Sequence, residues 1–182
     1  MSQSIQLGIQ TYFSPDDDTQ QVFLDFLSQA QHSIHIAIYS WHLPPAMDVI
    51  QTLLAGGRKI HLLMDHSQST GKYEAPEVQE LVQLGARVAI GTSRKHAILH
   101  DKYAVVDGLH VLSGSWNFSL SASQEANFLT IVSNPDFATL FMTNWQKQYD
   151  WIVTHEPQWQ PPQGISSPRF IPPAKIRRGK IS

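Results

Sequence analysis

Two hydrophobic periods alternate along the first half of the chain, and this alternation constrains the fold more than any other feature. Strand patterns cover residues 5–13, 33–40, 59–65 and 87–90, and a helical pattern fills each interval between them. Chains that alternate strands and helices in this way form sheets of mainly parallel strands, with the helices packed on the sheet faces. We therefore expect a parallel sheet over this half of the chain.

The three predicted helices have recognisable ends. Thr19 is placed to cap the first helix, a Pro-Pro pair at 44–45 begins the second, and a Gly-Gly pair at 56–57 ends it. The third helix covers about residues 76–84 and ends before Gly85.

The pattern changes beyond residue 100. Two strand patterns flank Asp107-Gly108, a dipeptide typical of a two-residue hairpin turn, and a strand over 128–132 precedes a helix over 136–151. An antiparallel hairpin makes the sheet mixed. The expected fold class is therefore α/β, with a mixed, largely parallel β-sheet flanked by helices on both faces.

Composition places the chain among ordinary soluble proteins. Its 182 residues suit one domain with a core of its own, and the lack of cysteine excludes disulfides, thiol nucleophiles and cysteine-ligated zinc. No apolar run approaches the ~20 residues needed to cross a bilayer, and the first residues do not form a secretory signal. We expect a cytoplasmic protein without stable membrane insertion.

The net charge of −2 conceals a division along the chain. Residues 1–154 carry 8 basic and 14 acidic side chains, whereas residues 155–182 carry five basic side chains and one acidic. Proline recurs after residue 155 and no apolar period survives, so we expect a folded domain over 1–154 and a Pro-rich basic tail, extended or disordered, over 155–182. The tail either meets an acidic partner or is simply solvated, and both interpretations stay open.

The residues with the clearest chemistry are His100 and Lys102. Side chains alternate along an extended strand, so these two share a face and place an imidazole beside an ammonium group. The ammonium supplies charge for a phosphate anion, and the imidazole can attack phosphorus or pass a proton.

The end of the next strand offers further groups for the same anion. Gly114 would let the backbone approach a ligand closely, and Ser115 and Asn117 carry neutral donors for phosphoryl oxygens. Ser119 or Ser121 is expected to cap a short helix whose N-terminus faces the anion.

Glu125 follows shortly before the next strand. A carboxylate there would hold an imidazole in the right tautomer and stabilise its protonated form.

These residues form the pattern H-x-K-x4-D-x6-G-S-x-N, which resembles the signature of the phospholipase D superfamily. The pattern consists of His100, Lys102, Asp107, Gly114, Ser115 and Asn117. The resemblance extends over about residues 5–151 to the short bacterial endonucleases with a single motif and to their mitochondrial, Zucchini-type relatives. It includes the stretches 12–15, 38–41 and 144–146.

The resemblance implies a phospholipase D-like catalytic domain that hydrolyses a phosphodiester without metal or cofactor. His100 would attack phosphorus and form a phosphohistidine, with Lys102, Asn117 and Glu125 as further catalytic residues and Ser115, Lys102 and Asn117 binding the substrate. A second histidine would protonate the leaving oxygen. The chain has one H-x-K and one G-S-x-N pattern, so we expect a homodimer in which two copies form one shared site on the two-fold axis.

Asp107 belongs to the motif, but it lies in the predicted turn with the opposite strand parity to His100. We therefore expect it to fix the hairpin rather than to touch phosphate.

Four other residues are groove candidates. His42 and His66 follow strands, where α/β proteins place their sites, although surface loop positions explain them as well. Trp41 and Trp116 either stack on a base or seal the core or the dimer interface.

Two further groups allow a functional and a simpler interpretation. Asp65 and His66 are neighbours at a strand end and should point apart, so no metal site is expected. The cations over 94–96 either steer a polyanion or form a solvated loop.

A nuclease acting on DNA or RNA is the preferred function, because the chain is compact and carries no lipid-binding insertion. The alternatives are a phospholipase D-type lipid phosphodiesterase or transphosphatidylase, and a non-catalytic nucleic-acid-binding module.

Overall fold

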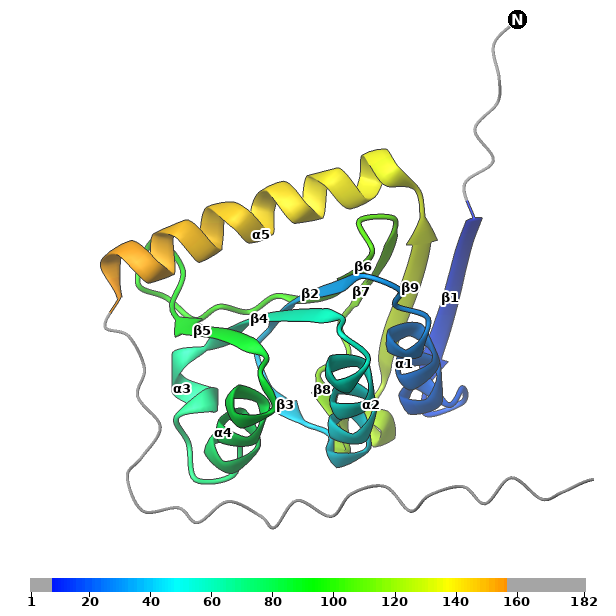
Figure 1. The fold of residues 1–182 in the computed structure, drawn as a ribbon. Helices are drawn as coiled ribbons and strands as arrows, with labels where there is room; N and C mark the ends of the chain where they lie inside the picture. The colour runs from blue at the N-terminus through cyan, green and yellow to red at the C-terminus, as the bar shows by residue number, and fades with distance from the viewer. Residues whose placement is uncertain (1–7, 157–182) are drawn as a thin grey trace, which may run out of the picture.

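The computed structural model describes residues 8–156, in which a seven-stranded sheet lies between helices on both faces (Figure 1). The strands are β1 (Gly8–Ser14), β2 (Ser33–Ile38), β3 (Trp41–His42), β4 (Lys59–Asp65), β5 (Arg87–Gly91), β6 (Lys102–Val106), β7 (His110–Gly114), β8 (Phe118–Ser119) and β9 (Asn127–Ser133). The helices are α1 (Thr19–Ser28), α2 (Pro44–Ala55), α3 (His66–Ser69), α4 (Ala75–Leu84), the short 3-10 helix η1 (Ser121–Gln124) and α5 (Pro135–His155).

The sheet is mixed, as predicted, but most of its pairings are antiparallel. Its order is β1-β9-β7-β6-β2-β4-β5, in which only β2–β4 and β4–β5 pair in parallel. The prediction of a largely parallel sheet was wrong because β1 does not lie beside β2. The hairpin β6–β7 takes that place and pairs antiparallel with β2, whereas β1 pairs with β9 at the far edge.

Strand β1 is an exposed edge rather than a half-buried strand. Ile9 and Phe13 are 58% and 56% exposed, whereas the alternation of apolar and polar residues over 5–13 is typical of a strand with one buried face. Residues 5–7 of the predicted strand lie outside the described residues.

Several helix ends follow the expected signals. Gly85 ends α4 with a φ of +100°, as its glycine predicted. Helix α1 is capped by Asp18, whose carboxylate accepts the N–H of Gln21, while Thr19 is buried as the first helical residue. The prediction of Thr19 as the cap was therefore one residue too late.

Helix α5 crosses one face of the sheet, and α1, α2 and α4 cover the other (Figure 1). The core under α1 and α2 contains the large aromatic side chains Phe23, Trp41, Trp116 and Phe118. The core under α5 includes Trp145, whose indole N–H donates to the backbone oxygen of Ile36 at 2.8 Å.

Helix α5 also runs past the predicted end at Trp151 and stops at His155. The predicted basic tail lies, from residue 157 onward, outside the described residues. Within residues 8–156, no helix combines the length and apolar character that a membrane span requires.

Candidate active site

Three of the motif residues, His100, Lys102 and Gly114, lie together where β6 begins and its neighbours β2 and β7 end, whereas Ser115, Asn117 and Asp107 lie outside the lining of the pocket there. Strand β6 begins at Lys102, which pairs with Ile38 at the end of β2, and Tyr103 pairs with Ser113 near the end of β7. His100 lies in the loop just before β6 and is exposed. Because β6 runs antiparallel to both neighbours, its first residues meet their last ones.

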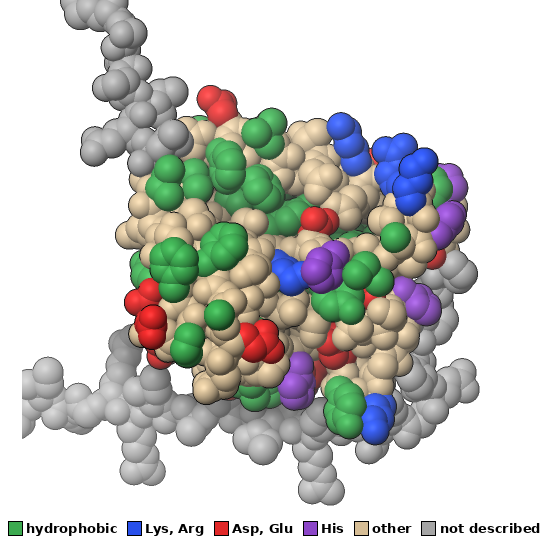
Figure 2. Space-filling view, turned by 180° about the vertical axis from the view of Figure 1, so that it is seen from behind, with side chains coloured by type: hydrophobic (Ala, Val, Ile, Leu, Met, Phe, Trp, Pro, Cys, Tyr) green, Lys and Arg blue, Asp and Glu red, His purple; other side chains and the backbone are tan. Residues whose placement is uncertain are grey.

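A pocket of about 400 Å³ opens at this edge, against helix α5. Its lining consists of His100, Asp101, Lys102, Tyr103, Ser113, Gly114, Leu140, Phe141 and Asn144. The face of the molecule in Figure 2 shows histidine and lysine side chains side by side at its centre. The structure thus brings the predicted imidazole and ammonium groups to one cavity.

Tyr39 holds both of these groups. Its ring lies 4.7 Å from the His100 ring in an edge-on arrangement, and the Lys102 ammonium lies 5.2 Å from the centre of the same ring. The ammonium also donates to the backbone oxygen of His100 at 3.1 Å. Burial lowers the pKa of Lys102, and the Asp101 carboxylate opposes this shift.

Asp65, at the end of β4, fixes the loop that carries His100. This carboxylate is buried, and one of its oxygens accepts the N–H of Leu99 at 2.7 Å. The other oxygen accepts from the backbone and hydroxyl of Ser67, at the start of α3. Gln68 of the same helix donates to the Tyr39 hydroxyl at 3.0 Å. One carboxylate therefore connects the backbone before His100 with the ring beside it.

Asn117 follows β7 and is half-buried. Its side-chain oxygen is buried and has no hydrogen-bond partner among the described residues. A buried acceptor without a donor is costly, so this oxygen is poised for an N–H donor, whereas the amide nitrogen suits a phosphoryl oxygen.

The side chain of Ser115 is hydrogen-bonded to the neighbouring strand β9. Its hydroxyl donates to the side-chain oxygen of Asn127 at 2.9 Å and accepts the N–H of Phe128 at 3.1 Å. A hydroxyl has one proton to donate, so binding of substrate through this donor requires that the bond to Asn127 break. Its predicted role in substrate binding stays a prediction.

Glu125 is exposed and accepts the side-chain N–H of Asn127 at 3.2 Å. Among the described residues no hydrogen bond joins it to an imidazole, so its predicted role in orienting a histidine also stays a prediction.

Gly114 was expected to let the backbone approach a ligand closely, but in the structure it lets strand β9 approach closely. A Cβ at this position would collide with the backbone oxygen of Phe128, so the glycine admits the neighbouring strand β9 as well as lining the pocket. The helix after it is the 3-10 turn η1, which begins after Leu120 without a side-chain cap. The predicted serine cap was therefore wrong, because the capping position falls on Leu120, whose side chain cannot accept a hydrogen bond.

Asp107 occupies the hairpin turn at the opposite end of β6, as expected. Its φ of +53° and that of Gly108, +65°, form the turn. Its carboxylate accepts the backbone N–H groups of Gln31, His32 and Ser33, each at 2.8 Å. Partial burial alone would raise the pKa of Asp107, but the three backbone donors outweigh it and the pKa lies below its usual range.

Two of the groove candidates belong to the core. Trp41 and Trp116 are fully buried around Phe23, so neither reaches a ligand and the alternative of a core role holds. Burial of these large apolar side chains in the core stabilises the fold more than their exposure in a groove would.

The two histidine candidates do not line the pocket at His100. His66 is exposed at the start of α3, beside the buried Asp65, as expected of neighbours that point apart. His42 is exposed and pairs with Glu77 at 2.6 Å. Burial raises the pKa of Glu77, and the nearby His42 opposes that shift.

Sequence reasoning gave no role to Tyr39, to Asp65 as an anchor, or to Asn144. Tyr39 follows a buried strand, the same signal that singled out His42 and His66, so that signal was sufficient to find it. Asn144 enters the site from α5, and the strand and helix patterns do not say which sheet edge that helix crosses.

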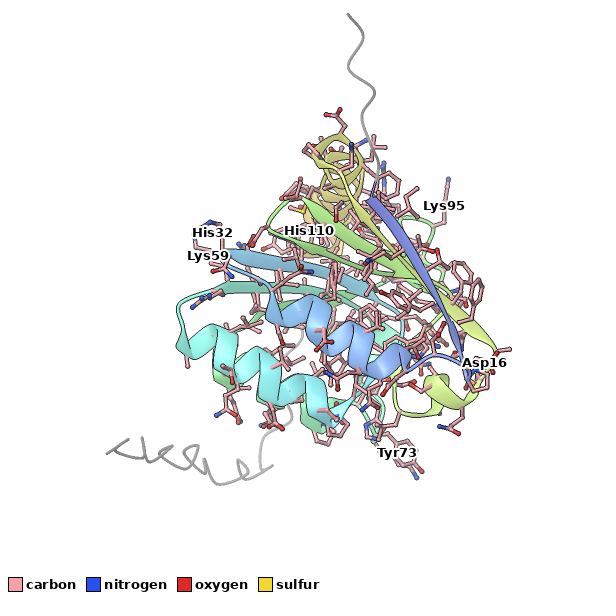
Figure 3. All side chains as sticks on the ribbon, turned by 90° about the vertical axis from the view of Figure 1, so that its right-hand side faces the viewer. Asp16, His32, Lys59, Tyr73, Lys95 and His110 are labelled. Atoms are coloured by element: carbon pink, nitrogen blue, oxygen red, sulfur yellow. The ribbon has the colours of Figure 1, made fainter. Side chains whose placement is uncertain are left out.

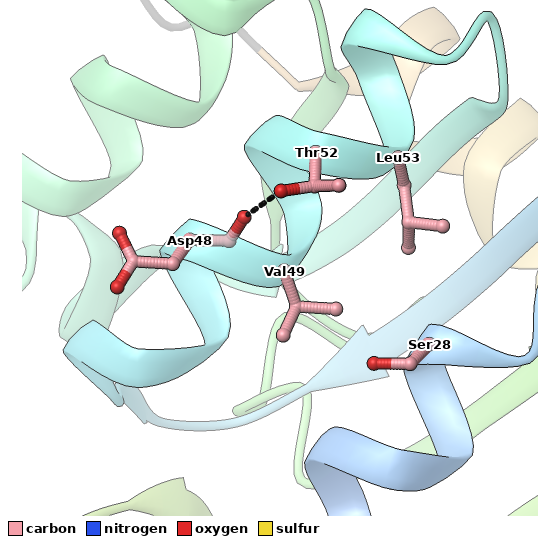
Figure 4. A pocket seen from close by; sticks show the side chains of 5 residues that line it. All are labelled: Ser28, Asp48, Val49, Thr52 and Leu53. Atoms are coloured by element: carbon pink, nitrogen blue, oxygen red, sulfur yellow. Dashed lines mark hydrogen bonds between the residues drawn. The ribbon is translucent and has the colours of Figure 1, made fainter. Parts of the chain in front are cut away.

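Residues 8–156 contain no cluster of three or more His, Cys, Asp or Glu side chains that could hold a metal ion. A separate hollow of about 260 Å³ lies between α1 and α2 (Figure 4). It is lined by Ser28, Asp48, Val49, Thr52 and Leu53, none of which belongs to the motif, and the bond drawn there, from the Thr52 hydroxyl to the Asp48 backbone oxygen, lies within α2.

The sequence matches the family described as "Cardiolipin synthase, PLD-like domain" over residues 23–149. It is 26% identical over 129 residues to a mitochondrial cardiolipin hydrolase of Chlamydomonas reinhardtii, covering 70% of this chain and 56% of that protein. It is 23% identical to a phospholipase D of Rickettsia bellii, covering 80% and 71%, and 31% identical to the human 5'-3' exonuclease PLD4, covering 69% and 29%. The chain thus spans little more than half of the algal relative.

Two solved structures share the fold. Nuc from Salmonella typhimurium, a phospholipase D family member, superposes with a TM-score of 0.74 at 23% identity, covering 80% of this chain and 95% of that one. NucT from Helicobacter pylori superposes with a TM-score of 0.73 at 19% identity, covering 80% and 97%.

Proposed function

The chain belongs to the phospholipase D superfamily, and from this premise we propose that it is a phosphodiester hydrolase that cleaves nucleic acid. The observation that carries the proposal is the pocket in which His100 and Lys102 open side by side. An ammonium group there attracts a phosphate, and an exposed imidazole can attack it.

The proposed reaction proceeds in two steps. An imidazole nitrogen of His100 attacks phosphorus, the bond to the leaving oxygen breaks, and a second histidine protonates that oxygen. The second histidine then takes a proton from water, whose oxygen attacks phosphorus and releases His100. Lys102 neutralises charge on the phosphoryl oxygens in both steps, and no step requires a metal or cofactor.

One relative supports nucleic acid as the substrate, because its printed name is that of a nuclease. PLD4, 31% identical over the matched residues, is named a 5'-3' exonuclease, while Nuc and NucT share the fold with this chain. The algal and rickettsial relatives are named for lipid substrates, so lipid cleavage is an outcome that the experiment must separate.

A second copy of the chain is the proposed source of the second histidine. His100 is the only histidine followed two residues later by lysine, and its pocket is open. Leu140, 66% exposed, and Ile98, 49% exposed, lie at the openings on either side of His100. Apolar side chains at such openings suit contact with a second copy.

The decisive assay offers DNA, RNA and phospholipid vesicles to the protein in excess chelator. We expect chelator-resistant cleavage of a nucleic acid that His100→Ala abolishes, a loss of at least about 10³-fold. His32→Ala is the matched control, because His32 lies on the opposite side of the molecule from Lys95 and the loop that leads to His100 (Figure 3). Headgroup release from lipid without nucleic-acid cleavage would contradict the proposal.

Mixed dimers test the shared site. Native and His100→Ala chains co-expressed at varied ratios should give activity that follows the square of the native fraction, since both histidines are needed. Activity proportional to the native fraction would show that each chain acts alone.

A further inference from the structure

A second pocket adjoins the first along α5. It has a volume of about 460 Å³ and is formed by the loop between β5 and β6 together with α5. Its lining consists of Ser93, Arg94, Lys95, Ile98, Leu99, His100, Asp101, Asn144 and Gln148. His100, Asp101 and Asn144 line both pockets, so the two form one continuous groove that passes His100.

The far end of this groove is basic. Arg94 and Lys95 are exposed, and within residues 8–156 neither side chain makes an ion pair or hydrogen bond. Lysine and arginine side chains gather at the upper right of Figure 2, over the loop after β5 and near the end of α5. Because no carboxylate pairs with these two cations among the described residues, they are available to attract an anion.

Asp101 is the one carboxylate in the lining of this pocket, and it is already engaged. One of its oxygens accepts the side-chain N–H of Gln148 at 2.7 Å. Its charge faces Lys102, whose pKa it raises against the effect of burial. The groove therefore passes from a lysine at the first pocket, over His100, to two cations at the second.

The loop that carries these cations is fixed at both ends. The Ser93 hydroxyl accepts the backbone N–H groups of Lys95 and Ala97 at 3.3 and 3.2 Å, and the Ser93 N–H donates to the Ala97 oxygen at 2.7 Å. At the other end Asp65 holds the N–H of Leu99. The backbone that carries the two cations thus keeps a set position relative to His100, as a subsite for part of a substrate requires.

We propose that Arg94 and Lys95 form a subsite for the phosphate next to the one that is cleaved, in a single nucleic-acid strand running along α5. This inference rests on the proposed nuclease activity and extends it to a substrate with consecutive phosphates. The pocket volume lies in the range of about 300–1,000 Å³ that accommodates small ligands, so it admits part of a nucleotide beside His100. A phospholipid with one phosphate leaves these cations unpaired.

Two substrates separate this subsite from the cleavage site. A chromogenic bis-aryl phosphate has one phosphate, whereas a short single-stranded oligonucleotide, of whichever nucleic acid the native protein cleaves, has consecutive ones. We expect Arg94→Gln and Lys95→Gln each to lower kcat/KM for the oligonucleotide about tenfold, and at least fivefold more than for the aryl diester. Each variant should also reduce the slope of log kcat/KM against log salt by about 0.7, the value for one contact to a single strand.

Lys59→Gln is the matched control. It removes one positive charge at the start of β4, on the side of the molecule opposite Lys95 (Figure 3), and should leave both activities unchanged. Thermal unfolding of each variant checks that the fold is intact.

The outcomes distinguish the two proposals. Equal losses for both substrates, no loss for the oligonucleotide, or an equal loss in Lys59→Gln would overturn the subsite while the nuclease proposal stands. A native protein that cleaves only anionic phospholipid vesicles would overturn the nuclease proposal, and the subsite with it.

Discussion

At one end of β6, Lys102 lies half-buried beside His100 and faces an open pocket, whereas at the other end Asp107 accepts three backbone N–H groups. Both residues belong to one sequence motif, separated by a single short strand. The first end presents an imidazole and an ammonium group to the pocket, and the second end uses its carboxylate for hydrogen bonds within the chain. Unsatisfied groups are available to a ligand, while satisfied ones stabilise the fold. The motif therefore supplies pocket residues at one end of β6 and a residue that stabilises the fold at the other.

The largest effect is expected from Lys102→Met. This change removes the ammonium from the pocket and should lower kcat/KM by about 10²–10³-fold. Burial disfavours the ammonium, so urea unfolding should show stability equal to or above that of the native protein. A clear loss of stability would show that Lys102 stabilises the fold, contrary to this expectation.

Lys102 should also set the alkaline limit of activity. Its pKa lies below the ordinary 10.5, so activity should fall as pH rises through that lowered value and the ammonium loses its proton. Lys102→Arg keeps its charge to higher pH and should move the decline upward. A decline at the same pH in both proteins would assign it to another group.

Asp107→Asn should reduce stability by about 1–2 kcal/mol while kcat/KM per folded molecule changes less than about twofold. Asparagine tolerates the positive φ of this turn, so the variant isolates the carboxylate. Asp16→Asn, an exposed residue in the turn between β1 and α1, is the matched control (Figure 3). A large loss of kcat/KM in a folded Asp107→Asn protein would contradict the division of the motif.

The stability difference between the native and Asp107→Asn proteins should depend on pH in one direction. The pKa of Asp107 is lower in the folded protein than its ordinary 3.8, so its stabilisation is present above that pH and lost as pH falls through the folded value. The stability difference between native and Asp107→Asn proteins should therefore shrink in acid.

Ser115→Ala should have the smallest effect, and it tests whether Ser115 stabilises the fold or binds the substrate. Loss of its bonds to Asn127 and Phe128 should cost about 1 kcal/mol in urea unfolding and lower kcat/KM less than about tenfold. A larger kinetic loss without a stability change would make Ser115 a substrate ligand.

The sequence was sufficient for the residues whose geometry is local. The pairing of His100 with Lys102 and the hairpin turn at Asp107 both follow from strand alternation and turn chemistry over a few residues. The antiparallel course of most of the sheet was not predictable, because a strand pattern does not specify its partner. The burial of Trp41 and Trp116 and the contact of Tyr39 with His100 depend on packing between distant segments, which no local period encodes.

Among residues 8–156, no strand pairs with the outer side of β1, and an exposed edge is a template for pairing with another chain. Three strand spacings separate it from β6, so two chains joined edge to edge through β1 would keep their His100 residues on the order of 30 Å apart. Such a pair has the mass of a dimer but two separate, half-complete sites. Molecular mass alone therefore does not identify the catalytic assembly; only the dependence of activity on both histidines does.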